Sequence, residues 1–595
     1  MAGSVAAAGP PALQVRYALC RAEISSPLFA ALAVKDEAAK FAEAAKSANM
    51  VALSRRIFCD HLTPVTAYRC LVKEDDIDAP SFLFESVNQG PQGPNMGRYS
   101  IVGAQPAMEI VAKENMVTVM DHEEGQKKEE FVDDPTVVPR RIMERWNPQS
   151  IDDLPDVFCG GWVGYFSYDT VRYVERKKLS FSNAPKMIEI FQMSTWLDRL
   201  VHSDRKPSDD RALNKKLIFL TFGFHSLQRM ESKAYVIHWV RVDRYASVEL
   251  AYRDGKNRLS FLMSKIQNID LPKLSAGFVD IRSREFRRSL TKATMSREMY
   301  KKAVLQAKEH ILAGDIFQIV LTQRFERRTF AHPFEVYRSV RIVNPSPYMA
   351  YLQARGCILV ASSPEMLIRV KKVKNNITPI GTQKFRFMVN QFAVSKLPLI
   401  QMRTEEEDIA LEQELVKDEK QCAEHIMIVD LGRNDVGKVS KFGSVRVENL
   451  MNVDRYSHVM HMSSTVSGEL QEHATCWDAL RAVMPVGTVT GTPKSDGVDR
   501  RARGDAAGPV QRGVRGVSFG GDMELALALR TIVFPTAPGI VSDGRPRRRR
   551  EWVAHLQAGA GIVADSQPDE EQRECESKAA APSLAIDLAE SAFLC

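Results

Sequence analysis

The chain has 595 residues, of which 44% are hydrophobic and 26% are charged, and its 81 basic and 74 acidic side chains leave a net charge of +7. These proportions are typical of a globular protein with a large core, and they exclude disordered, collagen-like and coiled-coil chains. The charge excess is small for this length, so we expect no nucleic-acid partner. No apolar run approaches the ~18 residues that a membrane span needs, so we expect no membrane partner.

The N-terminal residues have the composition of a targeting segment. They are rich in alanine and contain arginines, and the first acidic residue is Glu23, although serine is scarce. We expect residues 1–35 to be a transit peptide or disordered. The nine cysteines are scattered and form no Cys-x-x-Cys pair, which predicts a reducing compartment.

Short apolar runs between Gly, Pro and Asn clusters predict a strand-rich first region. Examples are 108–111, 117–120 and 234–242. Residues 269–289 contain prolines, glycines and many arginines without a clear period, which predicts a connection. We therefore divide the chain into an N-terminal region, 36–275, and a second region, 290–595.

The second region opens with a helix and a strand. Alanines and an isoleucine four apart, with a serine cap and a closing glycine, predict a helix over 296–314. The next run, 316–325, alternates apolar and polar residues. This pattern predicts a strand with Phe317, Ile319 and Leu321 on one face.

Two further helices are expected. A capping box at 404–407 predicts one helix that continues through the apolar segment 426–431. Glu424 enters the buried half of this helix, where a carboxylate must be hydrogen-bonded, paired or bound to a metal. The last helix starts near Asp569, and Pro582 should kink or interrupt it.

The available metal ligands are oxygen atoms, because the sequence has no zinc-type pattern of histidines or cysteines. Glu365, Glu424, Glu571 and Glu574 are candidates for Mg²⁺, which takes few carboxylates and completes its shell with water and substrate oxygens. On spacing alone these glutamates are more typical of solvated or salt-bridged surfaces than of a magnesium site, and both interpretations stay open.

Other motifs are less specific. The glycine-containing segments 487–494 and 559–561 match neither a P-loop nor a dinucleotide fingerprint, but their backbone N–H groups could hold a small carboxylate. His458 lies in an alternating pattern and is either a core histidine or a group for proton transfer or substrate contact. No acyl-transfer nucleophile motif occurs, so covalent acyl or amide chemistry is not expected.

Several longer segments resemble the large (alpha) subunits of anthranilate synthase, of the plant plastid type, which are chorismate-utilising enzymes. The matching segments are 307–315, 344–349, 418–435, 455–461, 526–530, 557–563 and 573–578. The resemblance runs from about Ala38 to Leu594. It implies an α+β fold in which two large β-sheets pack as a sandwich with helices on the outside.

The resemblance also implies an activity, a cofactor and a location. Members convert chorismate and ammonia to anthranilate and pyruvate, the first committed step of tryptophan biosynthesis, in the plastid (chloroplast) stroma. Mg²⁺ would be held by Glu424 and Glu574 and would bind the ring carboxylate of chorismate. Glu365 matches the general acid, and His458 and Thr488 match ring-contacting positions, with His458 assisting the elimination of pyruvate.

The enolpyruvyl carboxylate of chorismate has its own expected binding residues. By resemblance they are the side chains of Arg530 and Lys578 and the backbone of Gly559, Ala560 and Gly561. Arginine suits this role because its guanidinium binds a carboxylate as a two-pronged fork.

The resemblance further implies regulation and a partner. Tryptophan, the inhibitor, would bind at Glu85, Ser86, Asn344, Pro347, Tyr348 and Met349. Glu85 would pair with the ammonium of tryptophan, and Ser86 would add a hydrogen bond. Because this chain carries no glutaminase nucleophile, ammonia would come from a glutamine amidotransferase beta subunit in a heterotetramer.

Three stretches depart from the family pattern: 186–230, 383–401 and 495–516. In the third stretch the family has the segment Thr-Arg-Arg-Gly-Pro-Tyr-Ser-Gly-Gly-Phe-Gly. When the codons of that segment are read one base early, they encode residues 505–515 of this chain. We hypothesise a local frame shift that removes the family's tyrosine, which helps to hold the pyruvyl group. Sequencing the transcript tests this hypothesis. We therefore expect poor folding or strongly reduced turnover of the chain as written.

Other enzymes and roles stay open as alternatives. Relatives that aminate chorismate without eliminating pyruvate, or hydroxylate it, carry a lysine in a Pro-Ile-x-Gly-Thr motif. Residues 379–382 read Pro-Ile-Gly-Thr, so the lysine is absent. The alternatives are an aminodeoxychorismate or isochorismate synthase and a homologue without activity that binds tryptophan or the amidotransferase.

Overall fold

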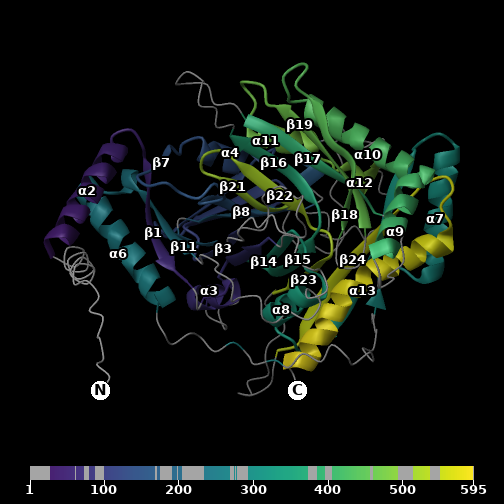
Figure 1. Ribbon diagram of the computed structural model, residues 1–595, viewed down its shortest axis with the longest axis horizontal. Helices are drawn as coiled ribbons and strands as arrows, with labels where there is room; N and C mark the ends of the chain where they lie inside the picture. Colours follow the sequence, from purple (N-terminus) through teal and green to yellow (C-terminus); the bar gives the residue numbers. More distant parts are fainter. Residues whose placement is uncertain are drawn as a thin grey trace, which may run out of the picture.

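The structure is a computed structural model. It describes residues 27–59, 62–72, 79–86, 99–167, 170–174, 191–196, 198–203, 233–267, 274, 277, 292–372, 385–394, 405–455, 460–492, 513–536 and 550–593. Two large β-sheets form its centre (Figure 1).

The first sheet joins thirteen described strands, and its neighbours pair antiparallel except for β1 with β7. Its order from edge to edge is β12 (Lys292–Ala293), β13 (Gln318–Thr329), β24 (Trp552–Ile562), β23 (Thr531–Pro535), β15 (Cys357–Ser363), β14 (Tyr348–Ala354), β2 (Ser81–Glu85), β3 (Tyr99–Ala104), β10 (Asp198–Ser203), β11 (Lys233–Arg241), β1 (Met50–Phe58) and β7 (Pro148–Ser150). The short β20 (Gly491–Thr492) also pairs with β13.

The second sheet joins eleven described strands. Its order is β18 (Arg446–Arg455), β19 (Met460–Glu469), β17 (Phe385–Val394), β16 (Met366–Lys372), β22 (Met523–Leu527), β21 (Gly513–Ser518), β8 (Gly161–Phe166), β9 (Phe191–Trp196), β4 (Met108–Lys113), β5 (Met116–Asp121) and β6 (Gln126–Phe131).

Helices cover the outer faces of both sheets. The first sheet packs against α2 (Pro27–Ala45), α3 (Pro64–Leu71), α6 (Val248–Gln267), α7 (Arg297–Leu312), α8 (Pro333–Val343) and α13 (Pro568–Phe593). The second sheet packs against α4 (Val137–Met143), α5 (Val171–Val174), α10 (Glu419–Gly437) and α11 (Cys476–Val483). A third apolar cluster fills the space between the sheets with residues of β1, β2, β8, β14 and β21. The expected α+β sandwich with helices outside is confirmed.

Strand β14 shows how the sequence specifies this layering. All seven of its residues are buried. Because successive side chains point to opposite faces of a strand, Met349 and Tyr351 pack on the helix side, while Ala350 and Leu352 pack between the sheets. A strand covered on both faces needs apolar residues throughout instead of an alternating pattern.

Several predicted elements are confirmed. The strands expected at 108–111, 117–120 and 234–242 correspond to β4, β5 and β11. Helix α7 begins after Ser296, whose Oγ accepts the N–H of Met299 at 3.2 Å. No helix among the described residues is long and apolar enough to cross a membrane.

Three expectations need correction. The helix predicted from 404 is two helices, α9 (Glu405–Lys417) and α10, because Asp418 ends the first and caps the second by accepting the N–H of Gln421. Phe317 precedes β13 and is 71% exposed, so it is not on the buried face. Helix α13 continues through Pro582 without interruption.

The departing stretches contribute strands to the sheets. Residues 191–196 and 198–203 form β9 and β10, and residues 385–394 form β17 between β16 and β19. The end of the third stretch forms most of β21, which pairs with β8 and β22. Residues 493–512, where the family's tyrosine is expected, lie outside the described part of the chain.

The division of the chain between 275 and 290 stays a prediction. Strands from before and after this connection lie side by side in both sheets, for example β2 with β14 and β8 with β21. Each sheet is therefore assembled from both regions.

An ion-pair cluster fixes α13 on the first sheet. Arg327 of β13 is buried, pairs with Asp587 and with Glu590 (2.9 Å), and donates to the carbonyl oxygen and Oγ of Ser583. Burial raises the pKa of Asp587, and the guanidinium of Arg327 opposes that shift. This cluster orients the helix that carries Glu574 and Lys578.

We expect Arg327→Ala to lower the free energy of unfolding by about 3 to 5 kcal/mol, because it leaves the Asp587 carboxylate buried without its cation. Urea unfolding measures this change. Arg328→Ala is the matched control, since that neighbouring side chain is 73% exposed and pairs with Glu551 at the surface. We expect the control to cost less than about 1 kcal/mol. Equal losses in both variants would contradict the assigned role of Arg327.

Candidate active site

Glu365 lies where the chain passes from the first sheet to the second, between β15 and β16. Its backbone is held on both sides: the N–H donates to Ser363 Oγ at 3.2 Å, and the carbonyl oxygen accepts the N–H of Leu527 at 3.1 Å. The residue is 6% exposed. Burial raises the pKa of its carboxyl to about 7, against the opposing charges of Arg530 and Lys578. A carboxyl that titrates near neutrality suits general acid catalysis.

Two cationic side chains act on this carboxyl. Arg530 lies in the turn between β22 and β23, and its φ of +47° is in the left-handed region. Residues with a side chain rarely adopt this conformation, and those that do cluster at functional sites. Lys578 of α13 donates to the carbonyl oxygen of Gly559 at 3.0 Å and pairs with Glu574 at 2.8 Å. Residues distant in the sequence thus meet around Glu365.

Gly559, Ala560 and Gly561 lie in strand β24, opposite Thr322, Leu321 and Val320 of β13. A Cβ atom on Gly559 would lie 2.5 Å from the carbonyl oxygen of Leu321, so a larger residue does not fit there. On its other side β24 pairs with β23 only at 555–556. Beyond that point, Lys578 reaches the backbone of Gly559. The predicted carboxylate contact by this backbone stays a prediction.

Glu424 is half-buried on α10, next to a histidine that the sequence reasoning missed. His425 is fully buried, and its Nε2 lies 2.7 Å from Ser464 Oγ. Burial lowers the pKa of His425 to about 4, so its ring is neutral. Its Nδ1 is buried without a hydrogen-bond partner among the described residues. The signal was available, because an imidazole inside an apolar helical run must be buried or functional.

The residues predicted to hold Mg²⁺ have suitable chemistry. Glu424 and Glu574 are half-buried carboxylates, and Mg²⁺ binds one or two carboxylates together with water and substrate oxygens. Helix α12 (Gly487–Thr490) contacts both α10 and β13, and α13 packs on β24 beside β13. Figure 1 shows α10, α12, β24 and α13 at one end of the molecule. No group of three or more His, Cys, Asp or Glu side chains in the described ranges forms a metal site.

Two predicted contacts with the substrate ring cannot be placed. His458 falls between β18 and β19, outside the residues that the structure describes. Thr488 lies in α12, but its side chain is also outside the description.

The residues predicted to bind tryptophan gather at the adjoining ends of β2 and β14. Glu85 and Met349 are direct partners across these strands. The Glu85 carboxylate pairs with Arg341 at 2.9 Å and accepts the hydroxyl of Tyr337 at 2.5 Å. Tyr348 is buried, which raises its pKa to about 12.

Three other residues of this set lie close by in the chain. They are Ser86, Asn344 and Pro347, and all three are half-buried. Asn344 Nδ2 donates to Ser362 Oγ at 3.4 Å, which anchors the turn before β14.

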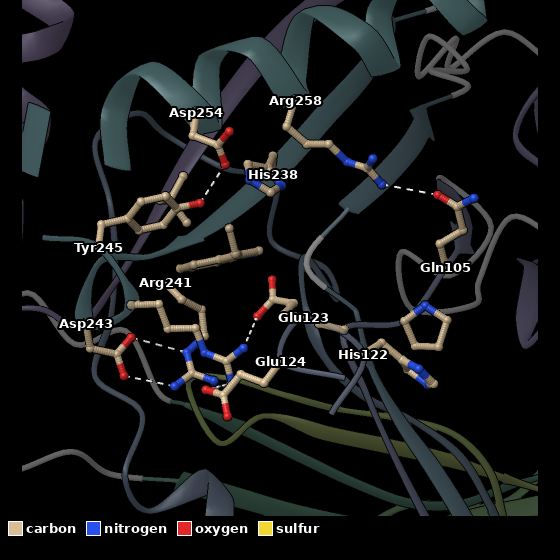
Figure 2. Close-up of a pocket in the computed structure, with 15 residues that line it drawn as sticks. Gln105, His122, Glu123, Glu124, His238, Arg241, Asp243, Tyr245, Asp254 and Arg258 are labelled. Atoms are coloured by element: carbon tan, nitrogen blue, oxygen red, sulfur yellow. Dashed lines mark hydrogen bonds and ion pairs between the residues drawn. The ribbon is translucent and has the colours of Figure 1, made fainter. Parts of the chain in front are cut away.

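A separate pocket of about 810 Å³ opens beside β11 and α6 (Figure 2). Its charged groups are paired with one another: Arg241 bonds to Asp243 at 2.8 Å, and Arg244 pairs with Glu123 at 2.7 Å. Tyr245 donates to Asp254 at 2.6 Å. None of the predicted site residues lines this pocket, and α6 lies at the opposite end of the molecule from α13 (Figure 1).

Comparisons with known proteins agree with this geometry. The family model described as chorismate binding enzyme matches residues 80–583. Anthranilate synthase alpha subunit 1, chloroplastic, from Oryza sativa subsp. indica is 58% identical over 581 residues, which are 97% of this chain and 94% of that protein. Anthranilate synthase alpha subunit 2, chloroplastic, from Arabidopsis thaliana is 58% identical over 566 residues, covering 94% and 85%.

A solved structure gives the same result. Anthranilate synthase component I from Streptococcus pneumoniae TIGR4 superposes with a TM-score of 0.58 at 26% identity, covering 89% of this chain and 99% of that one. The resemblance noted in the sequence is confirmed. The chain belongs to the chorismate-binding enzymes and, within them, to the chloroplastic alpha subunits of anthranilate synthase.

Proposed function

We propose that this chain converts chorismate and ammonia to anthranilate and pyruvate in the chloroplast, as the first step toward tryptophan. One observation carries the proposal: a buried carboxyl, Glu365, titrates near pH 7 beside two cations, Arg530 and Lys578. Chorismate is a dicarboxylate with a ring hydroxyl that must leave. The site therefore offers positive charge for a carboxylate and a proton for the departing oxygen.

Binding of chorismate falls to the cationic groups. Arg530 would hold the enolpyruvyl carboxylate through two parallel N–H bonds, and Lys578 would add a single charge. The backbone of Gly559 to Gly561 would line the same carboxylate, because glycine permits close approach. These contacts orient the ring so that the hydroxyl lies toward Glu365.

Proton transfer falls to Glu365. As ammonia forms a C–N bond to the ring, the ring C–O bond breaks and the protonated carboxyl delivers its proton, so that water leaves. The added nitrogen gives up a proton. In the second step the ring loses a proton and the bond between the ring and the ether oxygen breaks, which makes the product aromatic. The enolate of pyruvate leaves and takes up a proton at its methylene carbon to become pyruvate. His458 and Thr488 would contact the ring during this elimination.

Mg²⁺ is the cofactor of this proposal. Glu424 and Glu574 would hold the ion, which when bound supplies positive charge for the ring carboxylate of chorismate. Both side chains are carboxylates that are only partly buried, so they fit an ion that retains water ligands. Lys578 pairs with Glu574 at 2.8 Å and would keep this carboxylate in place.

The proposal includes a partner and an inhibitor. A glutamine amidotransferase beta subunit would supply ammonia in a heterotetramer. Tryptophan would bind at Glu85, Ser86, Asn344, Pro347, Tyr348 and Met349. This set adjoins the segment of Glu365, because Tyr348 is the partner of Ser363 across β14 and β15 and packs with Met366. Inhibition would be a coupling free energy between two neighbouring sites.

Fluorescence of anthranilate tests the proposal directly. The chain with chorismate, Mg²⁺ and an ammonium salt should produce anthranilate, and glutamine should replace ammonium only when the amidotransferase is added. An aminodeoxychorismate synthase or isochorismate synthase would consume chorismate without forming this product. A homologue without activity would leave chorismate unchanged, and either outcome would refute the proposal. Full turnover would instead overturn our expectation of impaired activity.

A further inference from the structure

Arg515 occupies a backbone position suited to glycine. It lies in β21, between Gly164 of β8 and Leu525 of β22, and its φ is +147°. Residues with a side chain rarely adopt this conformation. In the family run that corresponds to 505–515, the last residue is a glycine, and it falls at Arg515. The φ angle and the proposed frame shift therefore both indicate that Arg515 stands in place of a glycine.

The side chain of Arg515 enters the space between the two sheets. It is 11% exposed and pairs with Glu524 of β22 at 3.0 Å. Its guanidinium carbon lies 5.1 Å from the ring centre of Tyr348 and 5.8 Å from that of Phe84. Phe84 precedes Glu85 in β2, and Tyr348 opens β14. The guanidinium therefore lies against Tyr348 of the proposed tryptophan site and against Phe84, the neighbour of Glu85.

Neighbouring charges hold the guanidinium there. Glu524 also pairs with Arg369, which donates to the hydroxyl of Tyr348 at 3.4 Å. Burial opposes ionisation of Glu524, but the two guanidinium groups lower its pKa to about 2. The Glu524 carboxylate is therefore ionised at neutral pH and pairs with both Arg369 and Arg515.

We propose that Arg515 fills the tryptophan site with a guanidinium, so that this chain binds the inhibitor weakly and makes anthranilate without feedback control. The inference rests on the tryptophan site in the proposed function. An indole gains binding energy by stacking on an aromatic face, and the guanidinium lies over those of Tyr348 and Phe84. Its positive charge also repels the ammonium that would approach Glu85.

Calorimetric titration of the full chain with tryptophan tests this inference. We expect Arg515→Gly to bind tryptophan on the order of tenfold more tightly than the unchanged chain, since it removes the overlap and the charge. Arg515→Ala should show a similar gain, and it carries the test if the glycine variant does not fold. Arg328→Gly, an exposed strand arginine, is the matched control and should gain nothing.

A second substitution tests whether the added affinity for tryptophan arises at the proposed site. Adding Tyr348→Ala to Arg515→Gly should remove the gained binding. Unchanged binding after removal of Arg515, or tight binding by the unchanged chain, would overturn the inference. Anthranilate formation by the same samples reports separately on the proposed function, so its failure is distinguishable from a failure of this inference.

Discussion

Glu365→Gln should lower kcat for anthranilate formation with ammonium by roughly 100-fold or more, because glutamine cannot deliver a proton to the departing hydroxyl. The KM for chorismate should stay within about threefold, since glutamine keeps the shape and removes no predicted carboxylate contact. Stopped or continuous fluorescence of anthranilate measures both constants. Glu129→Gln is the control, because that side chain is 52% exposed on β6 and should leave both unchanged.

Although Glu365→Gln should lower activity, it should raise the free energy of unfolding at high pH. Burial raises the pKa of Glu365 in the folded protein to about 7 from 4.5, so its contribution to stability is complete below pH 4.5 and is lost as the pH rises through 7. The loss amounts to about 3 kcal/mol for a shift of this size. Urea unfolding at pH 9 should show Glu365→Gln more stable than the unchanged chain. A variant that is both less stable and fully active would refute the assignment.

Glu574→Gln should reduce anthranilate formation by roughly 100-fold or more, and Glu424→Gln should do the same, because each removes one of two charged ligands for Mg²⁺. Removing the ion with a chelator should abolish the activity of the unchanged chain, and adding Mg²⁺ should restore it. The variants should need much higher Mg²⁺ concentrations. Calorimetric titration with Mg²⁺ gives a second measure that does not depend on turnover.

Glu576→Gln is the matched control for this prediction. Glu576 lies on the same helix, two residues from Glu574, but pairs with Arg297 at 2.8 Å on another face. We expect unchanged activity and Mg²⁺ affinity. Equal losses in Glu574→Gln and Glu576→Gln would indicate a disturbed helix instead of a lost ligand.

Local signals in the sequence predicted elements well where they act on the backbone directly. Ser296 caps α7 because its hydroxyl reaches the N–H three residues on, and this needs no tertiary contact. The apolar pattern predicted a single helix across Asp418, but Asp418 caps a new helix there and separates α9 from α10. Phe317 fits an alternating pattern but lies just outside the pairing that begins at Gln318.

The candidate site was predicted by resemblance and not by spacing. Glu365, Arg530 and Lys578 lie in three separate parts of the chain, so only the paired sheets bring them together. The pKa of Glu365 depends on burial, which the sequence does not give. His425 was missed although its place in an apolar helical run was a signal. Its contact with Ser464 follows only from the packing of α10 against β19.

A crystallographic measurement can locate the metal ion in this protein. With Mn²⁺ replacing Mg²⁺ and chorismate bound, the anomalous signal locates the ion independently of the protein atoms. We predict a single peak touched by one oxygen from helix α10 and one from helix α13, supplied by Glu424 and Glu574. An ion bound elsewhere, or two carboxylates that face separate surfaces, would contradict the mechanism described above.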